Sequence, residues 1–111
     1  MMRFEHVDSQ AGSSLQGHFK ATYDELVTAF GEPTYRAEQD GGFDKVWTEW
    51  RLEFANGNKE PVYATIYDWK EDSPFTSRTG LYTWHIGGFD YRAEVCVGNV
   101  FEDSVKVPVH A

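Results

Sequence analysis

The sequence predicts an α+β fold in which a three-stranded antiparallel β-meander is flanked by an N-terminal and a C-terminal helix as a two-layer sandwich. Two segments, residues 22–31 and 90–101, place apolar residues at helical spacing. Three segments between them alternate apolar and polar residues with a period of two: 45–54, 62–69 and 81–86. A chain of 111 residues is long enough for one hydrophobic core, and a meander buries its apolar face against helices.

The expected domain spans residues 14–104, between a flexible N-terminal segment (1–13) and a C-terminal tail (105–111). Residues 15–21 alternate weakly and are interpreted as a short strand or an extended arm.

The first helix has clear start and stop signals. Thr22 and Glu25 stand at the spacing of a reciprocal capping box, and Gly31 with Pro33 prevents continuation. Residues 32–44 then have no period and predict a long surface loop.

The two central strands are predicted to form an antiparallel hairpin around Asn56-Gly57, a strong turn signal. One face of the first strand carries Trp50, Leu52 and Phe54, and the other carries Trp47, Glu49, Arg51 and Glu53. Because both faces hold large apolar groups, periodicity leaves open which face is buried.

The third strand is followed by Gly87 and Gly88, and then by a helix with Asp90 as a candidate cap. Two glycines before a helix expose backbone N–H groups that bind a phosphate or carboxylate, with His85 nearby. They equally permit a sharp turn and close packing of helix on sheet, and we favour this second interpretation because the chain lacks a full phosphate-loop motif.

The charge balance narrows the classes of function. Eighteen acidic against ten basic residues give a formal net charge of -8, which disfavours nucleic acids and anionic membranes as direct partners and favours a basic protein surface. No signal peptide or membrane span is apparent, and the single Cys96 excludes an internal disulfide, so the cytoplasm is the expected compartment.

Neither catalysis nor a cofactor finds support in the sequence. The four histidines lack the spacing of metal ligands, and no nucleophile motif is present, so we expect no metal and no enzyme activity. Asp68 next to Lys70 fits an acid–base pair, but a solvated ion pair at a strand end is the simpler interpretation.

Two sets of residues are candidate sites. The first is a partner-binding surface of aromatic side chains with carboxylates that steer a basic partner: Trp47, Glu49, Glu53, Tyr63, Tyr67, Glu38, Asp40 and Asp44. The second, an alternative site for a small ligand, comprises Lys70, Trp84, His85, Gly87 and Gly88.

Three stretches, "EPTY", "ATIYDWK" (64–70) and "TWHIGG" (83–88), together resemble a family of small uncharacterised proteins of bacteriophages and prophages. The resemblance covers roughly residues 22–97 and implies a phage accessory protein that acts in the cytoplasm of the bacterial host. The acidic loop and the C-terminal tail depart from the pattern of that family.

These observations lead us to expect an acidic phage protein that inhibits a host protein, such as a CRISPR effector or another defence component, by occupying a basic surface. Two alternatives stay open. One is a non-catalytic sponge for a small nucleotide or similar signal. The other is a structural or assembly protein that forms a homodimer or larger homo-oligomer through exposed strand edges.

Overall fold

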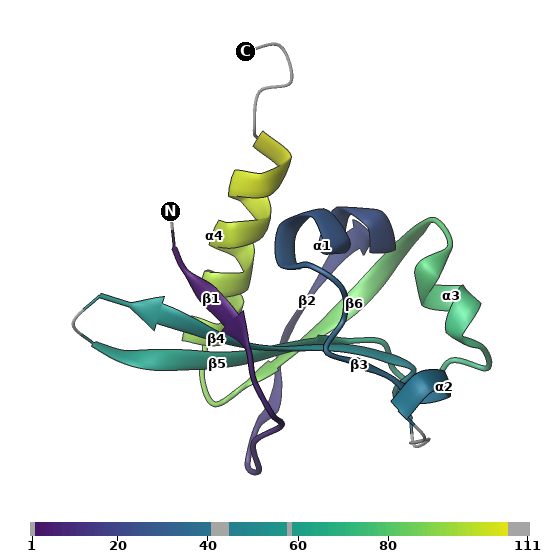
Figure 1. Cartoon of the computed structure of the whole chain (residues 1–111), viewed down its shortest axis with the longest axis horizontal. Coiled ribbons are helices and arrows are strands. Elements are labelled where there is room, and N and C mark those ends of the chain that lie inside the picture. The colour runs from purple at the N-terminus through teal and green to yellow at the C-terminus, as the bar shows by residue number, and fades with distance from the viewer. Residues whose placement is uncertain (1, 41–44, 58, 107–111) are drawn as a thin grey trace.

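The computed structural model describes residues 2–40, 45–57 and 59–106 of the chain. It confirms the α+β class (Figure 1). In chain order the elements are β1 (Phe4–His6), β2 (Ser14–Thr22), α1 (Tyr23–Phe30), β3 (Tyr35–Arg36), α2 (Ala37–Asp40), β4 (Thr48–Asn56), β5 (Lys59–Tyr67), α3 (Pro74–Arg78), β6 (Leu81–Gly88) and α4 (Arg92–Lys106).

One six-stranded antiparallel sheet forms the centre of the structure, with strand order β1-β4-β5-β6-β2 and β3 beside β4. The predicted central strands β4, β5 and β6 are confirmed, but the prediction of three strands was wrong, because the sheet has six. The architecture is not clearly the expected two-layer sandwich. β1 and β3 add to the outer edge of β4, and β2 adds beside β6.

The missed strands are short or depend on distant partners. β1 lies inside the segment that we expected to be flexible, where Phe4 pairs with Phe54 and packs on Phe30. β3 has only two residues, too few to show a period. Two short helices were not predicted either: α2, which lies in the segment 32–44 that we interpreted as a surface loop, and α3.

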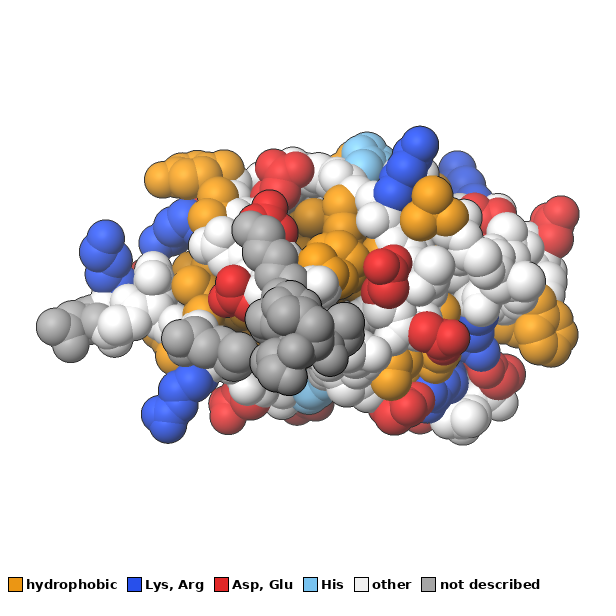
Figure 2. All heavy atoms as spheres, turned by 90° about the horizontal axis from the view of Figure 1, so that it is seen from above, with side chains coloured by type: hydrophobic (Ala, Val, Ile, Leu, Met, Phe, Trp, Pro, Cys, Tyr) orange, Lys and Arg blue, Asp and Glu red, His pale blue; other side chains and the backbone are white. Residues whose placement is uncertain are grey.

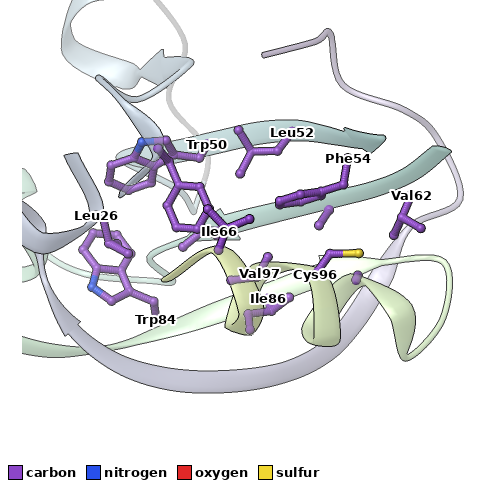
Figure 3. Packing of buried hydrophobic residues seen from close by; sticks show 14 of the residues in the cluster. Leu26, Trp50, Leu52, Phe54, Val62, Ile66, Trp84, Ile86, Cys96 and Val97 are labelled. Atoms are coloured by element: carbon purple, nitrogen blue, oxygen red, sulfur yellow. The ribbon is translucent and has the colours of Figure 1, made fainter. Parts of the chain in front are cut away.

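The core lies on the face of the sheet that carries Trp50, Leu52 and Phe54, which settles the question that periodicity left open. Figure 3 shows these side chains with Ile66 and Trp84 on neighbouring strands. The helices complete the core with the following buried residues: Leu26, Phe30, Ala93, Cys96, Val97 and Val100.

Helices α1 and α4 pack on this core face, whereas α2 and α3 lie at one end of the sheet (Figure 1). The capping box of α1 is confirmed, because Thr22 Oγ1 accepts from Glu25 N–H while the Glu25 carboxylate accepts from Thr22 N–H. Two indole N–H groups tie the core to the ends of this helix: Trp50 donates to Gly31 O and Trp84 to Ala21 O.

The opposite face of the sheet, which we call the helix-free face, is not covered by any helix among the described residues (Figure 1). Part of the connection between β1 and β2 lies over this face, where Gln10 N–H donates to the Tyr63 hydroxyl. This face therefore holds the side chains that strand periodicity points away from the core.

Candidate functional site

One transverse row of side chains crosses the helix-free face on five neighbouring strands. The strand register places these residues opposite one another: Tyr35 with Glu49, Glu49 with Tyr67, Tyr67 with His85, and His85 with His18. We call these five residues the aromatic row. Directly opposed side chains on antiparallel strands lie within contact distance, so the sheet assembles the row from distant parts of the sequence.

The rings of the row contact one another. Tyr67 stacks on His85 with ring centroids 5.3 Å apart, and His18 meets His85 edge-on at 4.6 Å. Trp69, 38% exposed, lies 6.1 Å from the Tyr67 ring and 6.3 Å from the His85 ring. We call these four rings, those of His18, Tyr67, Trp69 and His85, the aromatic platform.

Two lysines flank this platform. The Nζ atoms of Lys45 and Lys70 each lie 5.8 Å from the centroid of the Trp69 ring. Ammonium groups at this distance are attracted to the face of an indole. This end of the helix-free face therefore combines aromatic rings with two ammonium groups, in a chain of net charge -8.

Glu49 occupies the acidic position of the row. Its carboxylate accepts from Arg51 Nε at 2.7 Å, and the Arg51 guanidinium lies 5.0 Å from the centroid of the Tyr35 ring. Burial raises the pKa of Glu49, although the hydrogen bond from Arg51 opposes this shift. Because its charge is paired within the chain, Glu49 is a weaker steering group than we expected.

Two more groups of the row have shifted pKa values. Burial raises the pKa of the Tyr67 phenol. Burial also lowers the pKa of His85, and the neighbouring His18 lowers it further. His85 Nδ1 is buried and has no hydrogen-bond partner among the described residues. Both effects disfavour the charged form of His85, and the neutral ring suits stacking rather than ion pairing.

The other end of the helix-free face is acidic. Glu5 and Glu53 stand directly opposite each other on β1 and β4, and Glu53 in turn is opposite Tyr63 on β5. Tyr63 is only 5% exposed, because the β1–β2 connection lies over it and Phe89 packs against its ring at 5.7 Å. The expectation that Tyr63 is a solvent-exposed contact residue is therefore corrected.

The remaining candidates for partner binding are scattered. Trp47 is half buried, and its indole N–H donates to Glu71 O. Glu38 is paired with Arg78, and Asp40 accepts from the backbone N–H of Arg36. Asp44 lies outside the described residues.

The face from which α4 projects carries no continuous charged patch in the part of it that is visible in Figure 2. Acidic and basic side chains are interspersed there.

The residues of the alternative ligand site are split between two faces. His85 and Lys70 lie beside Trp69 on the aromatic platform, but Trp84 is fully buried in the core. Gly87 and Gly88 belong to β6 and pair with β5 and β2, so they do not begin a helix. The helix follows at Arg92, whose N–H donates to the Asp90 carboxylate, as expected of a capping residue.

Close packing explains both glycines. A Cβ atom on Gly87 would approach Thr65 Oγ1 to 2.5 Å, and one on Gly88 would overlap the Cβ of Ala93 on α4. Both positions are buried, and protein atoms fill the space where a side chain would begin. Gly88 thus serves the contact between helix and sheet, as in the interpretation that we favoured, whereas Gly87 makes room for Thr65 and Tyr67 on the neighbouring strand β5.

Asp68 has a structural role that the sequence did not reveal. It is fully buried, and its carboxylate accepts from Trp47 N–H, Thr48 N–H and the Ser77 hydroxyl at 2.8–3.1 Å. It therefore joins β4, β5 and α3 and is not an ion pair with Lys70. Its two backbone donors and one hydroxyl donor satisfy a carboxylate that burial would otherwise penalise.

Sequence reasoning missed three members of this site: His18, Tyr35 and Trp69. Only Trp69 had a local signal, since it directly follows a strand that carries Tyr67. The other two lie on edge strands that were predicted weakly or not at all. Among the described residues no group of three or more His, Cys, Asp or Glu side chains is placed to hold a metal ion.

Comparisons of the chain with protein families, with curated proteins and with solved structures found no match. The resemblance to small bacteriophage proteins therefore stays a prediction. No helix in the described ranges has both the length and the apolar character needed to cross a membrane. The fold and the site define an α+β domain in which no described helix covers one face of the sheet.

Proposed function

We propose that this chain is a non-catalytic binding protein that inhibits a host protein by occupying its surface, and that the helix-free face is the contact surface. One observation carries the proposal: aromatic side chains cluster on a sheet face that none of the described helices covers. Tyrosine and tryptophan supply much contact area at low entropic cost and dominate the energetics of protein interfaces.

The negative charge of the chain supports a basic partner, but on the helix-free face the described carboxylates without an ion pair lie at its acidic end. Two of the acids that we expected to steer the partner, Glu38 and Glu49, are neutralised by arginines of the same chain. Glu5 and Glu53 make no ion pair with any described residue. We therefore propose that these two carboxylates attract the basic surface of the partner. The phage origin and a host-defence target, such as a CRISPR effector, are part of the same proposal and rest on the sequence resemblance.

A matched pair of exposed aromatic residues tests this proposal. The change Trp69→Ala removes the exposed ring of the platform, and we expect it to weaken capture of the host protein from bacterial lysate by about tenfold or more, the effect of losing an aromatic interface anchor. Phe75→Ala is the control, because Phe75 is 73% exposed but lies on α3. Capture that is equal for both variants, or absent for the wild type, contradicts the proposal.

The nucleotide sponge keeps one specific observation in its favour. The Trp69 ring with the ammonium groups of Lys45 and Lys70 offers stacking for a base and cations for its phosphates. If this second function holds, a nucleotide in a panel of mono-, di- and cyclic nucleotides raises the melting temperature saturably. The rise is lost in Trp69→Ala and kept in Phe75→Ala. If no nucleotide of the panel raises the melting temperature saturably, the nucleotide sponge is excluded.

A further inference from the structure

A hollow opens at the acidic end of the sheet, where β6 stops and β5 continues. β6 pairs with β5 only along Ala64–Tyr67, so the preceding part of β5 has no partner on that side. The hollow measures about 380 Å³ and is lined by Gln10, Glu53, Glu60, Tyr63, Phe89 and Arg92, among others.

Its walls combine rings with carboxylates. The half-exposed ring of Phe89, which packs against the buried ring of Tyr63 with centroids 5.7 Å apart, forms an aromatic wall. Glu53 on β4 and Glu60 on β5 both line the hollow. The one cation of the lining, Arg92, is already held by Asp90 through contacts of 2.8–3.2 Å. The carboxylates of Glu53 and Glu60 are therefore available to a cation from outside the chain.

An unfavourable pairing of two carboxylates on neighbouring strands also favours a bound cation at this place. Glu5 and Glu53 are directly opposed on neighbouring strands, and like charges at that position destabilise a sheet. Neither carboxylate makes an ion pair or hydrogen bond with another described residue. A cation seated against Glu53 would relieve this repulsion.

We propose that this hollow binds an arginine side chain from the basic surface of a partner protein. A guanidinium is planar, so it stacks on the exposed face of Phe89 while its N–H groups donate to Glu53 and Glu60. Lysine offers a point charge without the flat face that the aromatic wall matches. The inference rests on the proposed function, since it names the group through which the partner docks.

The test is a titration of the full chain, labelled with ¹⁵N, with Nα-acetyl-arginine amide, followed by two-dimensional NMR. We expect saturable shift changes confined to amides around the hollow, those of Gln10, Glu53 and Phe89. Nα-acetyl-citrulline amide, of the same shape without charge, should bind at least about tenfold more weakly because it lacks charge-assisted hydrogen bonds. Nα-acetyl-lysine amide should fall between the two.

Matched variants separate the hollow from the general acidity of the chain. Glu53→Gln is expected to weaken arginine binding about tenfold, whereas Asp103→Asn removes the same charge from exposed α4 and should leave it unchanged. If Glu53→Gln does not fold, as judged from its amide dispersion, Glu60→Gln replaces it. Shifts spread over the whole surface, equal loss in both variants, or no saturable shift overturns the inference.

The results also separate this inference from the proposed function. If the arginine amide binds as expected but no host protein is captured through Trp69, the site stands and the proposed function fails. If a host protein is captured in a Trp69-dependent manner and Glu53→Gln binds it as tightly as the wild type, the proposed function stands and the arginine site fails.

Discussion

Replacement of Asp68 with alanine is expected to lower the free energy of unfolding by about 3–5 kcal/mol, a large part of the total stability of a small domain. The change leaves three donors without their acceptor: the N–H groups of Trp47 and Thr48 and the hydroxyl of Ser77. Thr48 and Ser77 are fully buried, so water does not replace the lost bonds without opening the structure.

Urea unfolding at pH 7 measures this effect against two companion variants. Asp68→Asn keeps an acceptor for the two N–H groups and an amide that donates to Ser77, so we expect it to lose no more than about 2 kcal/mol. Asp72→Ala removes a carboxylate from an exposed position nearby and should change stability by less than about 0.5 kcal/mol. An Asp68→Ala variant as stable as Asp72→Ala would contradict the buried network.

The change Gly88→Ala is expected to destabilise the protein by about 2–3 kcal/mol, because it adds a methyl group where none fits. The new Cβ would overlap the Cβ of Ala93 and lie 3.1 Å from the carbonyl oxygen of Tyr63. Ala93 is 1% exposed and fixed on α4, so relief requires the whole helix to move away from the strand.

Gly98→Ala is the control, and we expect it to change the stability in the opposite direction. It adds the same methyl group in the interior of α4, where nothing lies within 4 Å of the new Cβ. The higher helix propensity of alanine should stabilise the protein by about 0.5–1 kcal/mol. Thermal or urea unfolding of both variants thus gives changes of opposite sign. Two changes of the same sign would show that α4 does not seat on β6 at Gly88.

Features set by neighbouring residues could be predicted from the sequence. The capping box of Thr22 and Glu25, the stop at Gly31 and the turn at Asn56-Gly57 all depend on contacts within a few residues. The central strands were likewise readable from alternation along each of them. This is why α1 and the three central strands were found close to their observed bounds. The predicted second helix was too short, because α4 runs on to Lys106, into the segment expected to be the tail.

The candidate site was predicted only in part, because it is assembled across strands. Tyr67 and Glu49 were identified from their own strands, yet the contact of Tyr67 with His85 depends on the β5–β6 register. His18 joins them only because β2 pairs with β6, more than sixty residues further along the chain. Pairing at such sequence separation leaves no local pattern to detect.

The sequence by itself determined the α+β class, the first helix, the central hairpin and the acidic character of the chain, since local propensity and composition decide these. Only the tertiary structure decided which sheet face is buried, why Gly87 and Gly88 must be glycine, and that Asp68 is a buried acceptor rather than a surface charge. The physical reason is shared: each depends on which atoms of distant segments fill the adjacent space. Close packing fixes this only once helices and strands meet.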